Sequence, residues 1–141
     1  MAKKAEEKQA PIRQSVLVDC PIEDAFRLFT EQFAEWWPLP AHSMTGEQAD
    51  TCAIEPWLGG RVFERTRSGE EIEWGSVTTW DPPRHLEFTW HDQGSTVDVE
   101  FNVEADGTRV TVIHTGWEAK GVSACALHFS NYVAERALVA V

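Results

Sequence analysis

The sequence predicts an α+β domain in which a long C-terminal helix covers an antiparallel sheet. After residue 50, turn signals recur at intervals of about 9–14 residues, at Gly59-Gly60, Ser68-Gly69, Pro82-Pro83, Gly94 and Asp106-Gly107. Such intervals suit strands joined by hairpins and are too short for helical crossovers between parallel strands. Apolar and polar residues alternate between the turns, which gives each strand one apolar face. Apolar residues at helical spacing near the C-terminus provide an element to cover that face.

The size and charge of the chain limit its function. Its 141 residues, 43% of them hydrophobic, match one globular domain, which we assign to residues 11–141 after a loose polar tail over residues 1–10. The 12 Lys+Arg against 23 Asp+Glu give a net charge of −11, which disfavours nucleic acids and anionic membranes as partners. Without a membrane span or a secretory signal in the sequence, we expect a cytoplasmic protein. Its three cysteines fit neither a disulfide framework nor a paired-thiol zinc site, and we expect them to be reduced.

The first elements are a strand and an amphipathic helix. Aliphatic and β-branched residues predict a strand over residues 12–20, which stops at Pro21 because proline has no N–H for the sheet. Over residues 21–33 the apolar positions lie three or four apart, on one helical face: Ile22, Ala25, Phe26, Phe29 and Phe33. Pro21 suits the first helical position. A broken second turn of helix carries Trp36-Trp37 and ends at Pro38.

The strands that follow are best defined where alternation is regular. Their inward-facing residues are Leu86, Phe88 and Trp90, then Val97, Val99, Phe101 and Val103, then Val110, Val112 and His114. Between Gly69 and Asp81 two registers are open, because a slip of one residue exchanges the two faces of a strand. We predict that Trp74 faces inward and leave Trp80 open.

The C-terminal segment from Gly121 onward predicts a helix about 30 Å long, enough to cross the sheet. Its apolar stripe consists of Val122, Ala126, Phe129, Val133, Ala137 and Ala140.

Several short motifs, each weak alone, occur together in a characteristic order. They are Pro21 with Ala25-Phe26 and Phe29-Thr30, Trp36-Trp37-Pro38, Gly59-Gly60-Arg61-Val62, Trp74-Gly75-Ser76-Val77, Asp81-Pro82-Pro83, Phe88-Thr89-Trp90, Gly107-Thr108-Arg109-Val110 and His114-Thr115-Gly116-Trp117. Over residues 12–118 the sequence resembles the START-like (SRPBCC) superfamily, and within it the homologues of the activator of Hsp90 ATPase. The C-terminal segment differs, because Asn131-Tyr132-Val133 stands where many relatives have a Gly-Trp pair.

The resemblance implies the helix-grip fold. In that fold a curved antiparallel sheet of about seven strands is joined by two short helices after the first strand. A long C-terminal helix crosses the concave face, and a cavity lies between this helix and the sheet.

We predict an internal ligand site in that cavity. Its candidate residues are Trp37, Glu64, Trp74, Phe88, Trp90, Val112, His114 and Phe129. Aromatic side chains commonly line ligand pockets, and a helix about 10 Å wide cannot fill the whole concavity of a strongly bent sheet. The alternative is a solid core that the rings fill by themselves. Similarly, Trp36-Trp37 either plugs the space between helix and sheet or gates the mouth of the cavity.

The two polar candidates each have two interpretations. His114 shares the inward face with Val112, where it either bonds a ligand or is a core histidine bonded to backbone or to a nearby hydroxyl. Glu64 is either its partner or second anchor, or a solvated side chain, because Phe63 points the opposite way.

We predict no metal, nucleotide or other cofactor. The remaining histidines, His42, His85, His91 and His128, have no metal-ligand spacing on one element. Gly59-Gly60 lacks the further glycines and the following helix of a phosphate loop. No serine or cysteine has the setting of a covalent nucleophile.

Three functions remain. We favour a module that binds an apolar or aromatic small molecule, and we favour a binding protein over an enzyme. The resemblance also implies a co-chaperone that acts on the ATPase of Hsp90. It implies, as a third alternative, a cyclase-like or hydratase-like enzyme that uses His114 and Glu64 as acid or base.

Overall fold

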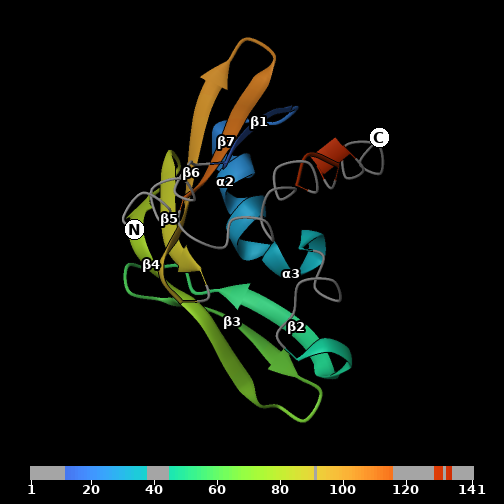
Figure 1. Ribbon diagram of the computed structural model, residues 1–141. Coiled ribbons are helices and arrows are strands. Elements are labelled where there is room, and N and C mark those ends of the chain that lie inside the picture. Colours follow the sequence, from blue (N-terminus) through green and yellow to red (C-terminus); the bar gives the residue numbers. More distant parts are fainter. Residues whose placement is uncertain (1–11, 38–44, 91, 116–128, 132, 135–141) are drawn as a thin grey trace.

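A curved antiparallel sheet forms the body of the molecule. The computed structural model describes residues 12–37, 45–90, 92–115, 129–131 and 133–134, with backbone alone for residues 12, 90 and 92–94. In that part of the chain, seven strands pair in the order β1-β7-β6-β5-β4-β3-β2 (Figure 1). They are β1 (Ile12–Val18), β2 (Ala49–Ile54), β3 (Arg61–Thr66), β4 (Glu71–Asp81), β5 (His85–Trp90), β6 (Asp92–Glu104) and β7 (Gly107–Thr115). The predicted run of hairpins is confirmed, with β1 added beside β7.

Two short helices follow β1, as predicted, and lie on the concave side of the sheet (Figure 1). They are α2 (Ile22–Glu31) and α3 (Phe33–Trp36), and a short 3-10 helix, η1 (Gly46–Gln48), precedes β2. Pro21 is the N-cap residue, with extended backbone, and not the first helical residue. The face of α2 that carries Ala25, Phe26 and Phe29 is buried, so the apolar spacing in the sequence identified the packed side of this helix.

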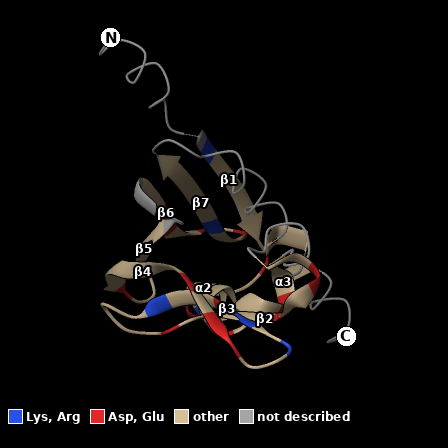
Figure 2. Ribbon diagram, turned by 60° about the horizontal axis from the view of Figure 1, so that its bottom comes forward, with Lys and Arg blue, Asp and Glu red and all other residues tan. Residues whose placement is uncertain are grey.

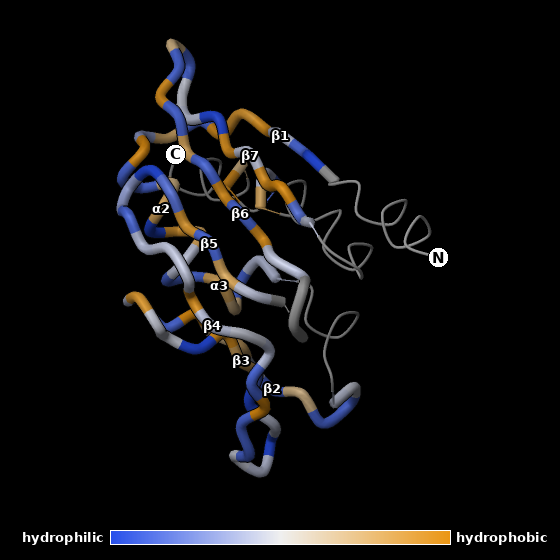
Figure 3. The backbone as a smooth tube through the Cα atoms, turned by 60° about the vertical axis from the view of Figure 1, so that its left-hand side comes forward, coloured by the Kyte–Doolittle hydropathy of each residue, from blue (hydrophilic) through white to orange (hydrophobic). Residues whose placement is uncertain are grey.

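Alternation of hydropathy along β5, β6 and β7 (Figure 3) positions one part of the core. The buried residues on these strands are Leu86, Phe88, Val97, Val99, Phe101, Val110 and Val112, each 3% exposed or less. The exception is Val103, predicted to face inward but 71% exposed. It lies near the tip of the β6–β7 hairpin, which extends beyond the rest of the sheet (Figure 1), so its apolar face has little to pack against.

Two irregularities decide which residues of β4 face inward. Val62 pairs with Gly75 but Phe63 pairs with Glu73, so Trp74 is the extra residue of a bulge, and a second shift follows Val77. Trp74 and Val77 are therefore both buried, at 2% exposure each, although no regular strand would place both on one face. The inward prediction for Trp74 is confirmed. Trp80 is partly buried with its ring edge-on to Phe26, at 5.1 Å between centroids.

The predicted C-terminal helix lies mostly outside the described residues. Residues 129–131 and 133–134 are helical, and within them Phe129 and Val133 are buried. The Phe129 ring contacts Phe29 of α2 and Trp36 of α3, at 5.0 Å and 5.3 Å between centroids. These contacts, the strand order and the paired short helices make the fold a helix-grip fold. Among the described residues, no helix is long and apolar enough to cross a membrane.

Candidate functional site

A group of aromatic rings occupies the space between α3 and β4. The ring of Phe33 stacks on Trp37 at 5.2 Å and meets Trp74 edge-on at 6.4 Å, and Trp37 lies 6.0 Å from Trp74. Trp37 is 5% exposed and Trp74 is 2% exposed. Two of the predicted ligand-site residues therefore lie together. Trp36 joins them, with its indole N–H donating to the Phe29 carbonyl at 3.1 Å.

The end of α3 explains how Trp37 reaches this position. The helix stops at Trp36, and Trp37 adopts extended backbone while its N–H still donates to the Phe33 carbonyl at 3.0 Å. Pro38 follows, and the residue before a proline is driven out of helical conformation by steric clash with the ring. The termination predicted from the sequence thus turns the second indole toward β4.

Glu64 is the most unusual residue of the interior, because its side chain is 0% exposed. The Trp74 indole N–H donates to its Oε1 at 2.8 Å, and the Thr45 backbone N–H donates to its Oε2 at 3.1 Å. The Thr45 hydroxyl donates to the same Oε2. A buried carboxyl needs such donors to offset the loss of water. The interpretation of Glu64 as a solvated surface side chain is therefore wrong.

Phe63 explains why the alternation around Glu64 was ambiguous. This ring is on the other face of β3 but is also buried, since the guanidinium of Arg61 lies 4.2 Å above it and that of Arg65 lies 5.9 Å away. Cation–π packing of this kind covers a ring without a second protein layer.

The environment of Glu64 also affects the pKa of a neighbouring thiol. Cys52 of β2 pairs with Glu64 across the strands and is buried. Burial, and secondarily the Glu64 carboxylate, raise the pKa of the Cys52 thiol to about 12. A thiol with so high a pKa is a poor nucleophile at neutral pH. Cys20 and Cys52 are both free thiols.

His114 forms a second buried polar group, on β7. Its side chain is 1% exposed, and Nε2 lies 2.7 Å from the hydroxyl of Ser95, which is fully buried. The hydroxyl contact agrees with the sequence-based interpretation of a core histidine bonded to a nearby hydroxyl. The described partners of Glu64 are Trp74 and Thr45, so the suggested pairing of Glu64 with His114 stays a prediction.

The other candidates lie in the same core. Phe88 of β5 and Val112 of β7 are buried, and Phe129 packs against α2 and α3. The side chain of Trp90 lies outside the described part of the chain. The structure thus brings Trp37, Glu64 and Trp74 into direct proximity and places His114 on another strand.

The family model for activator of Hsp90 ATPase homolog 1-like proteins matches residues 19–136. The chain belongs to this family. No curated protein sequence compared with the chain is significantly similar to it.

Solved structures similar to this family member cover most of the chain. A protein from Mesorhizobium loti has 17% identity and a TM-score of 0.63, over 90% of this chain and 98% of its own. An AHSA1-like protein from Aeromonas hydrophila has 19% identity and a TM-score of 0.62, over 92% and 95%. These two establish the fold. The anthrahydroquino-γ-pyrone synthase Txn09, solved in complex with a molecule designated SUM, has 33% identity and a TM-score of 0.56, over 88% of each chain.

Two residues of this family member that touch the predicted site were missed by the sequence analysis. Thr45 donates to Glu64 from 19 residues away, and Ser95 meets His114 from a neighbouring strand, also 19 residues away. Pairing of Val97 with His114 sets this juxtaposition, and a strand pattern read alone does not give the register between strands.

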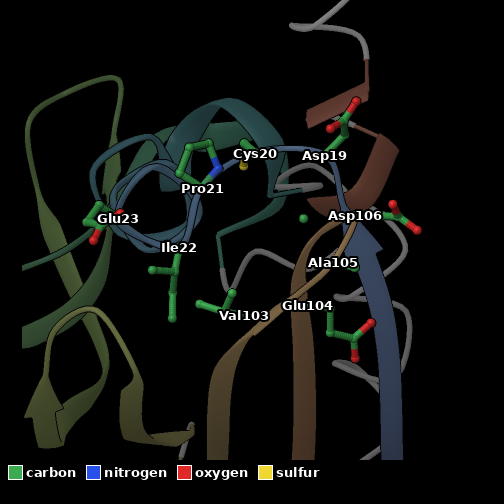
Figure 4. Close-up of a pocket in the computed structure, with 10 residues that line it drawn as sticks. Asp19, Cys20, Pro21, Ile22, Glu23, Val103, Glu104, Ala105 and Asp106 are labelled. Atoms are coloured by element: carbon green, nitrogen blue, oxygen red, sulfur yellow. The ribbon is translucent and has the colours of Figure 1, made fainter.

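Pockets lined by described residues also open on the outside of the domain, away from the predicted residues. One of about 840 Å³ lies between the start of α2 and the end of β6, where Figure 4 shows Ile22 and Val103 beside the acidic residues Asp19, Glu104 and Asp106. Another, of about 360 Å³, lies between α2 and the turn at Pro82-Pro83. Acidic residues are also prominent on both short helices (Figure 2), in keeping with the net charge of −11.

Proposed function

We propose that this protein binds an aromatic small molecule against the inner face of its sheet, next to Trp37 and Trp74, with Glu64 as the polar anchor. The observation that carries the proposal is the burial of the Glu64 carboxyl beside these indole rings. Removing a carboxylate from water costs several kcal/mol, so a site of purely structural purpose is better served by an apolar side chain. Ligand sites, by contrast, combine apolar walls with a few fixed polar groups.

The chemistry of the anchor suggests the kind of ligand. A carboxylate accepts hydrogen bonds, and indole rings favour flat, polarisable partners through offset stacking. A hydroxylated aromatic molecule meets both requirements, since its ring lies against the indoles and its hydroxyl donates to Glu64. The second buried polar group, His114 with Ser95, would contact another polar substituent.

Binding is tested with purified protein by native mass spectrometry before and after organic extraction, and by tryptophan fluorescence with a dihydroxyanthraquinone as the probe. We expect a co-purified mass or saturable quenching. We also expect affinity to fall at least tenfold in Trp74→Phe and Glu64→Gln. The matched controls are Trp57→Phe, since Trp57 is 53% exposed on the β2–β3 turn, and Glu73→Gln on the exposed side of β4. Equal affinity in all four variants contradicts the proposal.

A second candidate, an enzyme that closes a ring on such a ligand, is favoured by the 33% identity to the synthase Txn09. In the simplest chemistry of this class, a phenol oxygen adds to a nearby carbonyl carbon of a 1,3-diketone side chain, and the carbonyl oxygen becomes a hydroxyl. That hydroxyl leaves as water while the neighbouring methylene carbon loses a proton and a ring C=C bond forms, so the phenol proton and the methylene proton account for the two hydrogens of the water. Glu64 would accept the phenol proton and His114 would donate to the departing hydroxyl. An ortho-hydroxyaryl 1,3-diketone incubated with the protein should lose one water, as measured by mass spectrometry, and His114→Asn should slow that loss without lowering ligand affinity tenfold.

The remaining candidate, activation of Hsp90, rests on the family name. Adding the protein to an Hsp90 and measuring ATP hydrolysis separates it from the other two, because neither ligand binding nor ring closure predicts a change in that rate.

A further inference from the structure

The convex face of the sheet carries a group of metal-ligating side chains that the proposed function does not use. Leu86 and Phe88 of β5 point into the core. His85 is the first residue of β5, directly before Leu86, so its side chain points to the opposite, outer face. His85 pairs across the strands with Glu100 of β6, and Asp98 lies two residues along β6 on the same face. One ligand atom from each of His85, Asp98 and Glu100 lies within 4.8 Å of the other two.

The spacing of these atoms is close to what a tetrahedral ion needs. Zinc bonds to imidazole nitrogen and carboxylate oxygen are about 2.0–2.2 Å long, which places neighbouring ligand atoms about 3.3 Å apart. His85 Nε2 and Asp98 Oδ2 are now 2.8 Å apart. A small separation of this pair and a rotation of the longer Glu100 side chain would bring all three to the required spacing. The backbone, fixed by pairing of β5 with β6, would not move.

The second observation concerns the oxygens of Asp98. While Oδ2 contacts His85, the other oxygen, Oδ1, is buried and has no hydrogen-bond partner among the described atoms. Buried carboxylate oxygens are normally satisfied. The Asp98 side chain as a whole is 24% exposed, so an ion can reach it, and a cation bound by both carboxylate oxygens would satisfy Oδ1.

The charge around the group also favours a cation. Glu87, which pairs with Asp98, adds a further carboxylate and accepts from the hydroxyls of Thr78 and Thr79. The β7 neighbours of Glu100 and Asp98 are the uncharged Thr111 and Ile113.

Arg13 of β1 pairs with Ile113 and lies two strands from Asp98 on this face. Two arginines nearer the group are engaged elsewhere. Arg84 forms an ion pair with Asp81 at 3.5 Å, and Arg109 forms one with Glu104 at 3.1 Å. Neither neutralises the carboxylates of the group.

From these observations we infer that His85, Asp98 and Glu100 form a divalent cation site on the convex face, selective for zinc or a similar borderline ion. The imidazole favours zinc over calcium and magnesium, which prefer oxygen ligands. A water molecule would complete the coordination, and the ion would join β5 to β6. The site has no part in the ligand site proposed above, which lies on the opposite face. Spacing along one element could not reveal it, because the three residues meet only through strand pairing.

The test uses the full-length protein, stripped of metal with a chelator and kept reduced, and titrated with Zn²⁺ in a calorimeter at neutral pH. We expect one equivalent to bind, with Mg²⁺ and Ca²⁺ far weaker. Affinity should fall at least about tenfold in His85→Gln, Asp98→Asn and Glu100→Gln, since even indirect partners of a metal ligand change affinity by 10–100-fold. The control Glu73→Gln, an exposed carboxyl on β4, should bind like the wild type.

Each other outcome overturns the inference. Zinc bound equally by the wild type and all the variants would belong to cysteines or to other histidines. Loss in His85→Gln alone would rule out the three-residue site, and absence of binding by the wild type would rule out any. Far-UV circular dichroism checks that each variant folds. If His85→Gln does not fold, the zinc affinity of Glu100→Gln, a surface substitution of nearly the same shape, tests the site instead.

Discussion

Replacing Glu64 with glutamine tests whether the buried carboxyl is held as an acceptor. Its Oε1 accepts from the Trp74 indole N–H at 2.8 Å, and its Oε2 accepts from the Thr45 backbone N–H at 3.1 Å and from the Thr45 hydroxyl. Glutamine has nearly the same shape but only one oxygen. Its amide NH₂ must therefore face either the indole N–H or the Thr45 backbone N–H, both of which are donors. In either orientation a buried or partly buried donor loses its bond to the carboxylate.

The magnitude follows from that loss. A buried donor left without a partner costs about 1–3 kcal/mol, so Glu64→Gln should lower the free energy of unfolding by about that amount. Urea denaturation with fluorescence detection measures it, and Tm should fall by roughly 3–4 °C for each kcal/mol. The same substitution at Glu73, which is exposed, should stay within about 0.5 kcal/mol of the wild type.

A double-mutant cycle assigns the effect to the contact with Trp74. Trp74→Phe removes the indole donor, so combining it with Glu64→Gln should cost less than the sum of the single changes, with a coupling of about 0.5–3 kcal/mol. A Glu64→Gln variant as stable as the wild type, or strict additivity with Trp74→Phe, would refute the reasoning.

Three further predictions concern local chemistry. Gly75→Ala should destabilise the protein by about 1–3 kcal/mol or more in thermal unfolding, because the added Cβ would lie 2.0 Å from the Thr89 carbonyl oxygen; an unchanged Tm would mean that β4 and β5 can separate here. Cys52, whose thiol pKa is about 12, should resist iodoacetamide in the native protein and react only in denaturant, as followed by peptide mass spectrometry; rapid native labelling would contradict its burial. Hydrogen bonds from Arg61 lower the pKa of Glu55 below its usual 4.5, so stability present above that value should decline as pH falls through the lowered pKa, and Arg61→Met should flatten this acid dependence of Tm; parallel profiles would show that the pair does not contribute.

The element order was predictable because it rests on local patterns. The spacing of Phe26, Phe29 and Phe33 defined the packed helical face, and alternation identified Phe88 and Val112 as buried. Alternation failed at Val103, where the strand runs past the elements that cover it.

The environment of the candidate site was less predictable, because it depends on register and on bulges. Trp74 is buried together with Val77 only because an extra residue interrupts β4. Glu64 is buried because Trp74 and Thr45, 10 and 19 residues away, both reach it. Contacts between residues this far apart in the sequence depend on strand register and do not produce a periodic pattern in the sequence.

The pairing of β1 with β7 has a consequence for how the protein is made. Ile12 pairs with His114 and Val18 with Thr108, so β1 leaves the ribosome roughly ninety or more residues before its partner strand is synthesised. Until then its hydrogen-bonding edge is unmatched, and a nascent chain with such an edge is exposed to wrong pairing. Closure of the sheet is therefore a late event of biosynthesis.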